Sequence, residues 1–158
     1  YFPFGAVMIA EGVVEVFEKD TTGKAAIGHG YTYSGHPVGA AAAIACLAET
    51  KRLNVVENAA ARGAQLWAGI NALKAKYPVI GDVRGGHGLM LALEMVADRS
   101  TKAAPDKALP GKVQTVAYQA GAMVRVSGAN IILSPPLVLT AADAQIILDA
   151  LDAGFAAL

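Results

Sequence analysis

A helical repeat that stops at a proline is the feature that most limits how this chain can fold. Between Val56 and Tyr77, apolar residues return every three or four positions, the period of a helix with one buried face. Pro78 ends the pattern, because proline lacks an N–H and clashes with the preceding helical turn. β-Branched and apolar residues over 79–84 and 89–96 then predict two strands of a sheet with one covered face.

The remaining segments alternate between helices and short strands, which indicates an α/β fold class with an α+β module from about Asn54 to the C-terminus. Pro37 suits a first helical position, and Asn54 with Glu57 has the spacing of a capping box. The other expected segments are a strand over 6–10, a polar connector over 11–24, a loop over 28–35, a helix from Pro37 to about Lys51, a surface loop over 99–111, a helix over 112–120, strands over 123–126 and 130–133, and a last helix capped by Thr140 and Asp143 with Ile147, Leu151, Phe155 and Leu158 as its buried stripe.

Composition narrows the expected partners and compartment. Hydrophobic residues make up 54% of the 158 residues and charged ones 16%, which is typical of a compact folded chain. The formal net charge is zero, so no electrostatic argument supports nucleic acid or an anionic membrane as a partner. No apolar run reaches the length of a membrane span, and no basic secretory start is present. We therefore expect small-molecule or protein partners and a cytoplasmic location.

The single cysteine, Cys46, cannot form an internal disulfide. Its place in an alanine-rich helical pattern predicts a small buried side chain in a reducing compartment. No basic residue lies in its helical turn to activate the thiol, so a nucleophilic role is not expected.

The stretch GHGYTYSGHPVGAAAA, from Gly28 to Ala43, places glycines and hydroxyl residues just before a helix. Two interpretations are open. Glycines let the backbone approach a ligand, and Thr32 with nearby N–H groups could donate to a phosphate. Alternatively, the stretch is a domain-joining loop in which Ser34 or His36 caps the helix, the interpretation that residue types alone favour. The spacing matches neither the Walker loop nor the dinucleotide fingerprint.

The three histidines, His29, His36 and His87, raise the question of a metal site. They lack ligand-like spacing, and no cysteine or carboxylate cluster accompanies them in the sequence. No metal site is therefore expected. The glycine-rich segment 85–88 around His87 is predicted to be a tight bend between two strands, because no helix start follows it.

Arg125 interrupts an otherwise apolar strand, and a guanidinium there needs a carboxylate partner or an open edge. One interpretation is structural: a salt bridge to Asp82 or Glu94, or simple exposure on an edge strand. The other interpretation is functional: the guanidinium binds a substrate carboxylate through two parallel hydrogen bonds. The pattern alone favours the structural interpretation.

Four segments of the chain are informative together: YFPFGAVMIAEGVVEVF, GHGYTYSGHPVGAAAA, DVRGGHGLMLALE and MVRVSGANIILSPPLVLT. In their sequences, order and separations they resemble the class III (omega) aminotransferases, the pyridoxal-phosphate enzymes of fold type I that include amine:pyruvate transaminases. The resemblance covers essentially the whole chain. It implies the C-terminal part of the large domain plus the small domain: 1–35 ending the large cofactor-binding domain, 36–53 an interdomain helix, and 54–158 the small α+β domain.

The resemblance also implies roles for three residues. Thr32, with Tyr31 beside it, matches the threonine that contacts the cofactor phosphate of the neighbouring subunit, so a homodimer with shared active sites and bound pyridoxal 5'-phosphate is expected. Arg125 matches the arginine that pairs with the carboxylate of an amino or keto acid and swings away for an apolar amine.

The family's Schiff-base lysine precedes the Tyr-x-Pro-x-Gly segment, which places it upstream of Tyr1. No lysine of this sequence, Lys19 and Lys24 included, matches that motif position. The chain also opens on apolar residues without an initiator methionine, which indicates that residues precede Tyr1. No catalytic residue is therefore assigned within these residues, and the chain alone is expected to be inactive.

The expected function of the full-length protein is transfer of an amino group from an amine or omega-amino acid donor to a keto acid acceptor such as pyruvate. A different class of function stays open: a non-catalytic binding or scaffold module, or one half of a split protein, derived from the same fold. A third possibility is another branch of the family, acting on ornithine, 4-aminobutyrate or glutamate semialdehyde.

Overall fold

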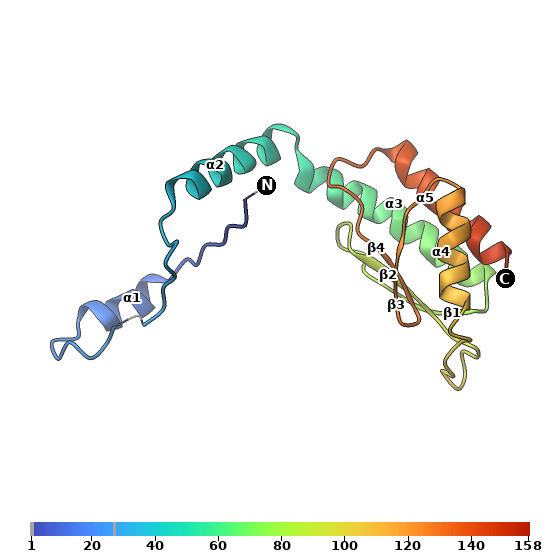
Figure 1. Ribbon diagram of the computed structural model, residues 1–158, viewed down its shortest axis with the longest axis horizontal. Helices are drawn as coiled ribbons and strands as arrows, with labels where there is room; N and C mark the ends of the chain where they lie inside the picture. The colour runs from blue at the N-terminus through green and yellow to red at the C-terminus, as the bar shows by residue number, and fades with distance from the viewer. Residues whose placement is uncertain (1, 27) are drawn as a thin grey trace. The chain divides into compact units, whose positions relative to one another are not determined.

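The computed structural model describes residues 2–26 and 28–158, which form two compact units, Tyr1–Arg52 and Leu53–Leu158. Figure 1 traces the elements of both units. Among its described residues, the first unit contains α1 (Glu11–Glu18) and α2 (Pro37–Arg52). The elements of the second unit are α3 (Val55–Lys76), β1 (Ile80–Arg84), β2 (Leu91–Met95), α4 (Leu109–Gln119), β3 (Arg125–Ser127), β4 (Asn130–Leu133) and α5 (Ala141–Ala156).

An antiparallel sheet in the order β1-β2-β4-β3 organises the second unit. Burial alternates along the central strands, as it does in a sheet with one covered face: Leu91, Leu93 and Met95 are buried, whereas Ala92 and Glu94 between them are half-buried. Helices α3 and α4 pack against this sheet, and α5 packs on both helices (Figure 1). The opposite face of the sheet is open within this unit.

Strand register aligns four side chains in one row across the open face. Arg84 is paired with Ala92, Ala92 with Ile132, and Ile132 with Arg125. Directly paired residues of antiparallel strands share a face, so all four side chains project to the same side. The row runs between the two edge strands, β1 and β3, and the residue at each end is an arginine.

The core lies between the sheet and the three helices. Its fully buried side chains come from each layer, and burial of each large aliphatic side chain stabilises the fold by roughly 1.5–3 kcal/mol. They include Leu66, Ile70, Ile80, Leu93, Met95, Val113, Ile131 and Leu151. Among the described residues, no helix is both long and apolar enough to cross a membrane.

Several expected elements are confirmed. Helix α2 begins at Pro37, and α3 ends at Lys76, just before Tyr77 and Pro78. Strands β1, β2 and β4 fall within the expected segments, whereas β3 begins two residues later and ends one residue later than the expected strand over 123–126. The capping box at α5 also forms, since the Thr140 hydroxyl accepts from the Asp143 N–H and the Asp143 carboxylate accepts from the Thr140 N–H.

The capping box expected before α3 is wrong. Asn54 precedes the helix with a φ of 51°, in the left-handed region, and its side chain makes no cap hydrogen bond. An N-cap residue normally has extended backbone angles, which direct its side chain back toward the first free N–H groups. Asn54 and Glu57 therefore have the sequence spacing of a capping box, but the backbone conformation of Asn54 does not allow the box to form.

Two expectations in the first unit are also wrong. Residues 6–10 form no strand, because they pair with no other described segment, and a strand exists only through its ladder. The expected connector contains α1, in which Val14 and Phe17 are the half-buried apolar positions of one face. Lys19 pairs with Glu15 one turn earlier, at 2.5 Å, and supports that helix.

Smaller differences concern the ends and faces of helices. Helix α4 begins at Leu109 rather than residue 112, and Pro110 occupies its first turn, where a missing N–H costs nothing. Val56 and Leu158, expected in buried stripes, are 67% and 42% exposed. Val56 is the second residue of α3, in which Val55 is the buried valine, and Leu158 lies two residues beyond the end of α5.

Asp152 ties the C-terminal end of α3 to α5. Its carboxylate accepts hydrogen bonds from the Lys76 ammonium at 2.7 Å and from the Tyr77 hydroxyl at 2.8 Å. The Tyr77 ring also stacks on Phe155, with ring centroids 5.7 Å apart. The bond from Lys76, and then that from Tyr77, lowers the pKa of Asp152 below its ordinary value of 3.8.

This lowered pKa predicts acid sensitivity of the α3–α5 contact. A carboxylate whose pKa is lower in the folded state stabilises the fold above its unfolded pKa, and the contribution disappears as pH falls through the folded pKa. The stability gap between the wild type and Asp152→Asn should therefore narrow below pH 3.8. Urea unfolding between pH 7 and pH 3, with Lys76→Met as a second variant, checks this; a gap independent of pH in both variants would contradict it.

Candidate functional site

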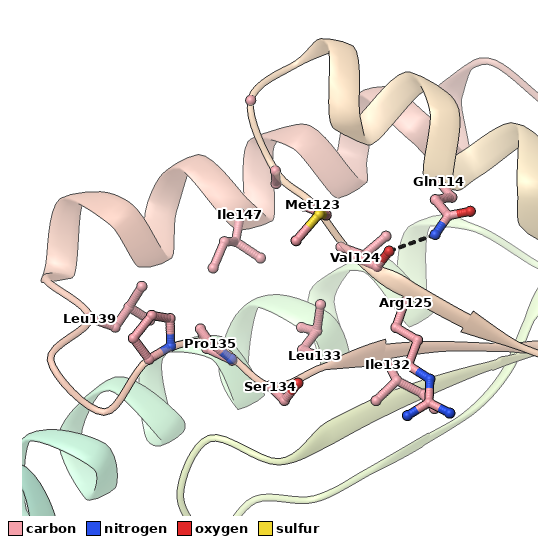
Figure 2. Close-up of a pocket in the computed structure, with 13 residues that line it drawn as sticks. Gln114, Met123, Val124, Arg125, Ile132, Leu133, Ser134, Pro135, Leu139 and Ile147 are labelled. Atoms are coloured by element: carbon pink, nitrogen blue, oxygen red, sulfur yellow. Dashed lines mark hydrogen bonds between the residues drawn. The ribbon is translucent and has the colours of Figure 1, made fainter. Parts of the chain in front are cut away.

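Arg125 stands on the open face of the sheet, at the start of the edge strand β3. Its side chain is exposed and extends beside Ile132, its partner in the strand register (Figure 2). Within residues 2–26 and 28–158, the guanidinium makes neither an ion pair nor a hydrogen bond. A bidentate donor set is therefore presented to the open side of the sheet.

The acids of the same face are already paired with other cations, so the expected salt bridge from Arg125 to Asp82 or Glu94 is wrong. Asp82 lies 3.1 Å from the Lys74 ammonium and 3.4 Å from Arg84. The hydrogen bond from Lys74 holds the pKa of Asp82 below its ordinary value. Glu94 pairs with Arg84. The structure thus shows the other structural alternative, exposure of Arg125 on an edge strand.

A cavity of about 540 Å³ lies beside Arg125, between β3, β4 and α5. Its lining is mainly apolar, and Figure 2 shows Met123, Ile147 and Leu139 around it, with Arg125 and Ile132 at one end. The polar side chains in the lining are those of Arg125, Gln114 and Ser134. Such a site suits a ligand that combines an apolar body with an anionic group.

Thr32 lies in a tight turn before α2. Ser34 closes this turn, since its hydroxyl accepts from the Tyr31 N–H at 3.0 Å and its own N–H donates to the Tyr31 carbonyl at 2.9 Å. Gly35, with a φ of 72°, supplies the left-handed step that follows. Thr32 is exposed and Tyr31 is 74% exposed, and the Thr32 hydroxyl bonds to no other described residue.

His36 caps α2, as one of the two interpretations of this stretch predicted. Its Nδ1 accepts from the Gly39 N–H at 3.2 Å, and its ring stacks on Phe2 with centroids 5.3 Å apart. The segment around His87 forms the bend between β1 and β2, as expected. In the part of the chain that the structure describes, no three His, Cys, Asp or Glu side chains gather into a metal-binding group.

Cys46 is exposed, so its expected burial is wrong. Within the first unit α2 buries only Gly39, against the Phe2 and Phe4 rings, and Cys46 lies almost two turns further along the helix. An alanine-rich pattern indicates a helix but does not show which of its faces will be covered.

Gln114, which the sequence did not single out, belongs to this site. Its side-chain amide donates to the Val124 carbonyl at 2.7 Å, which links α4 to the residue just before Arg125 (Figure 2). A glutamine in the middle of an amphipathic helix carries no sequence signal for this contact.

Comparison with known proteins identifies the family. A family model for class-III aminotransferases matches residues 2–155. The chain belongs to the class-III aminotransferases. An amine transaminase from an uncultivated Pseudomonas species, solved in its PLP-bound form, is 42% identical with a TM-score of 0.84, covering 93% of this chain and 33% of that one. This likeness confirms the expected α/β fold class and fold type, that of a fold-type-I transferase.

Two curated relatives support the same family. An uncharacterized aminotransferase of Sinorhizobium fredii is 40% identical over 89% of this chain and 31% of its own length. The probable gamma-aminobutyrate transaminase 3, mitochondrial, of Oryza sativa subsp. indica is 33% identical over 89% of this chain and 28% of its own. The chain thus spans between 28% and 33% of the length of these class-III aminotransferases. The domain boundaries, the upstream lysine and the roles of Thr32, Tyr31 and Arg125 stay predictions.

Proposed function

We propose that the full-length protein is a pyridoxal-phosphate transaminase that moves an amino group from an amine or omega-amino acid to a keto acid such as pyruvate. The observation that carries this proposal is the unpaired guanidinium of Arg125 on a sheet face where Asp82 and Glu94 are already paired. A guanidinium binds a carboxylate through two parallel hydrogen bonds. A keto acid brings such a carboxylate, whereas a simple amine does not.

In this proposal Arg125 orients the acid substrate. Two parallel hydrogen bonds fix both the position and the plane of the carboxylate, which reduces the motion left to the reacting end of the substrate. The apolar lining beside it, from Ile132, Leu139 and Ile147, accommodates a substituent that carries no charge. Arg125 would thus distinguish substrates by whether they bring a carboxylate.

The donors around Thr32 fit the phosphate of pyridoxal 5'-phosphate. An exposed hydroxyl without a partner among the described residues, held in a closed turn, suits a phosphate oxygen as an acceptor. When bound, this cofactor supplies the carbonyl group and electron-withdrawing ring that amino transfer requires. The exposure of Thr32 and Tyr31 within their own unit supports their proposed use across a homodimer interface.

Donor class and compartment are part of the proposal. The amine transaminase at 42% identity supports an amine:pyruvate specificity over a 4-aminobutyrate specificity like that named for the rice relative at 33%. We propose a cytoplasmic location, with which a single cysteine that cannot form a disulfide within these residues agrees.

The full-length protein supplied with pyridoxal 5'-phosphate tests this function directly. An arylalkylamine plus pyruvate should yield alanine and a ketone, measured by chromatography, and 4-aminobutyrate plus pyruvate serves as a second donor arm. Transfer from 4-aminobutyrate alone would place the protein in another branch of the family. Cofactor binding without transfer from any donor would favour the non-catalytic alternative.

Thr32→Ala should weaken binding of the cofactor about tenfold, because one hydrogen bond to a charged phosphate is lost. The dissociation constant is measured by titrating the apoprotein and following the absorbance of the bound cofactor. Thr32→Ser restores a hydroxyl and should recover most of the affinity. Thr21→Ala, an exposed threonine of the same unit, is the matched control. Equal retention by Thr32→Ala and the wild type would remove Thr32 from the phosphate site.

A further inference from the structure

The start of β3 is held from two sides. On one side, Arg125 is paired with Ile132 of β4. On the other side, the Gln114 amide of α4 donates to the Val124 carbonyl at 2.7 Å. Val124 itself is 4% exposed, so its side chain is packed while its carbonyl is held by Gln114. The Gln114 side chain thus holds the backbone of the residue just before Arg125.

This contact matters because β3 is short and lies at the edge of the sheet. It contains three residues and, within this unit, pairs only with β4. An edge strand has a free row of backbone groups on its outer side, and nothing in its ladder restrains that side. A single-residue error of register would also turn Arg125 to the opposite face of the sheet.

Gln114 lies on α4 between side chains that are buried in the core, and its own amide makes the contact with the segment before β3. Its neighbours on α4, Val113 and Ala117, are fully buried in the core, whereas Gln114 is half-buried and lines the same cavity as Arg125. Val113 and Ala117 thus anchor α4 in the core, and the Gln114 side chain links this helix to the residue next to Arg125.

We infer that Gln114 is a positioning residue for Arg125: by holding the Val124 carbonyl, it sets where the Arg125 fork meets the carboxylate of the acid substrate. This inference rests on the proposed function, in which Arg125 binds that carboxylate. It predicts that Gln114 acts on acid substrates only through Arg125 and leaves amines without a carboxylate unaffected.

The test uses the full-length holoenzyme and the substitution Gln114→Met, which preserves length and removes the donor. KM for pyruvate should rise about five- to tenfold with kcat nearly unchanged, since one neutral hydrogen bond that positions the fork is lost. The specificity constant for an arylalkylamine should change by no more than about twofold. Gln119→Met makes the same change at an exposed position of α4 and should leave both values as in the wild type.

A double-mutant cycle separates positioning from general damage. On an Arg125→Ala background, Gln114→Met should add no more than about twofold to KM for pyruvate, because the group that it positions is absent. A full additional loss on that background, an equal loss for the amine, or an unchanged KM in the single variant would each overturn the inference. If Gln114→Met unfolds the protein, as judged by its thermal midpoint, Gln114→Asn replaces it. The asparagine side chain is one methylene shorter, so from the same backbone position its amide does not reach the Val124 carbonyl, which lies 2.7 Å from the Gln114 amide. The same rise in KM for pyruvate is then expected.

The proposed function and this inference fail in different ways. If Arg125→Ala reduces pyruvate and amine use equally, the proposed role of Arg125 is wrong. If Arg125→Ala reduces pyruvate use more than amine use, while Gln114→Met does not, only the positioning role of Gln114 is wrong.

Discussion

Arg125→Ala in the full-length protein is expected to lower kcat/KM for pyruvate and for L-alanine about a hundredfold, because a bidentate pair with the substrate carboxylate is lost. An arylalkylamine donor should lose no more than about threefold, since it makes no such pair. The measurement is the specificity constant of each half-reaction, taken from the absorbance change of the bound cofactor. The ratio of the two losses, rather than either loss alone, reports the role of the guanidinium.

Arg84→Ala is the matched control for this prediction. Arg84 lies in the same row of the open sheet face, but its guanidinium is already bound by Glu94 and Asp82. Its removal should therefore change acid and amine use by similar factors. Arg125→Lys keeps the charge without the fork and should fall between the wild type and Arg125→Ala for the acid substrates. Equal losses for both substrate classes in Arg125→Ala would assign that residue a purely structural role.

Gly63→Ala is expected to destabilise the second unit by about 2 kcal/mol, because a methyl group cannot fit between α3 and the bend that joins β1 and β2. A Cβ at position 63 would lie 2.3 Å from the Gly88 carbonyl oxygen and 2.8 Å from its carbon. Both are backbone atoms, so no side chain can rotate away to relieve the overlap. The loss outweighs the roughly 1 kcal/mol by which alanine normally favours a helix over glycine.

Hydrogen exchange of the α3 amides in the full-length protein measures this destabilisation locally. Gly111→Ala provides the comparison: that glycine lies in the first turn of α4, and a Cβ there meets no atom within 4 Å. Its substitution should slow exchange slightly in α4. Wild-type exchange rates in α3 of Gly63→Ala would show that the helix and the bend separate easily.

The parts of the fold that were predictable are those encoded by local patterns. The helical period ending at Pro78, the proline at the start of α2 and the Thr140–Asp143 box each act within a few residues. The failures have a common physical cause, dependence on something distant. A strand over 6–10 needs a partner, the burial of Cys46 needs a covering surface, and the Asn54 cap needs a particular φ.

The candidate site divides in the same way. Arg125 was recognisable as a charge in an apolar strand, whereas the pairing of Asp82 with Lys74 depends on where α3 crosses β1. The hydrogen bond from Gln114 to Val124 depends on the turn after α4, which returns the chain so that the segment before β3 lies beside the helix. The role expected for Thr32 came from resemblance alone, because the residues of a turn do not indicate what the turn will bind.

The strand order has a consequence for biosynthesis. The hairpin of β1 and β2 can assemble as soon as both strands have left the ribosome, but β3 joins the sheet only through β4, which is made after it. A nascent chain that stops between Arg125 and Leu133 therefore carries the arginine on a strand whose start contacts α4 but whose ladder partner, β4, is still missing. The carboxylate site proposed at Arg125 would therefore be complete only after β4 has joined the sheet.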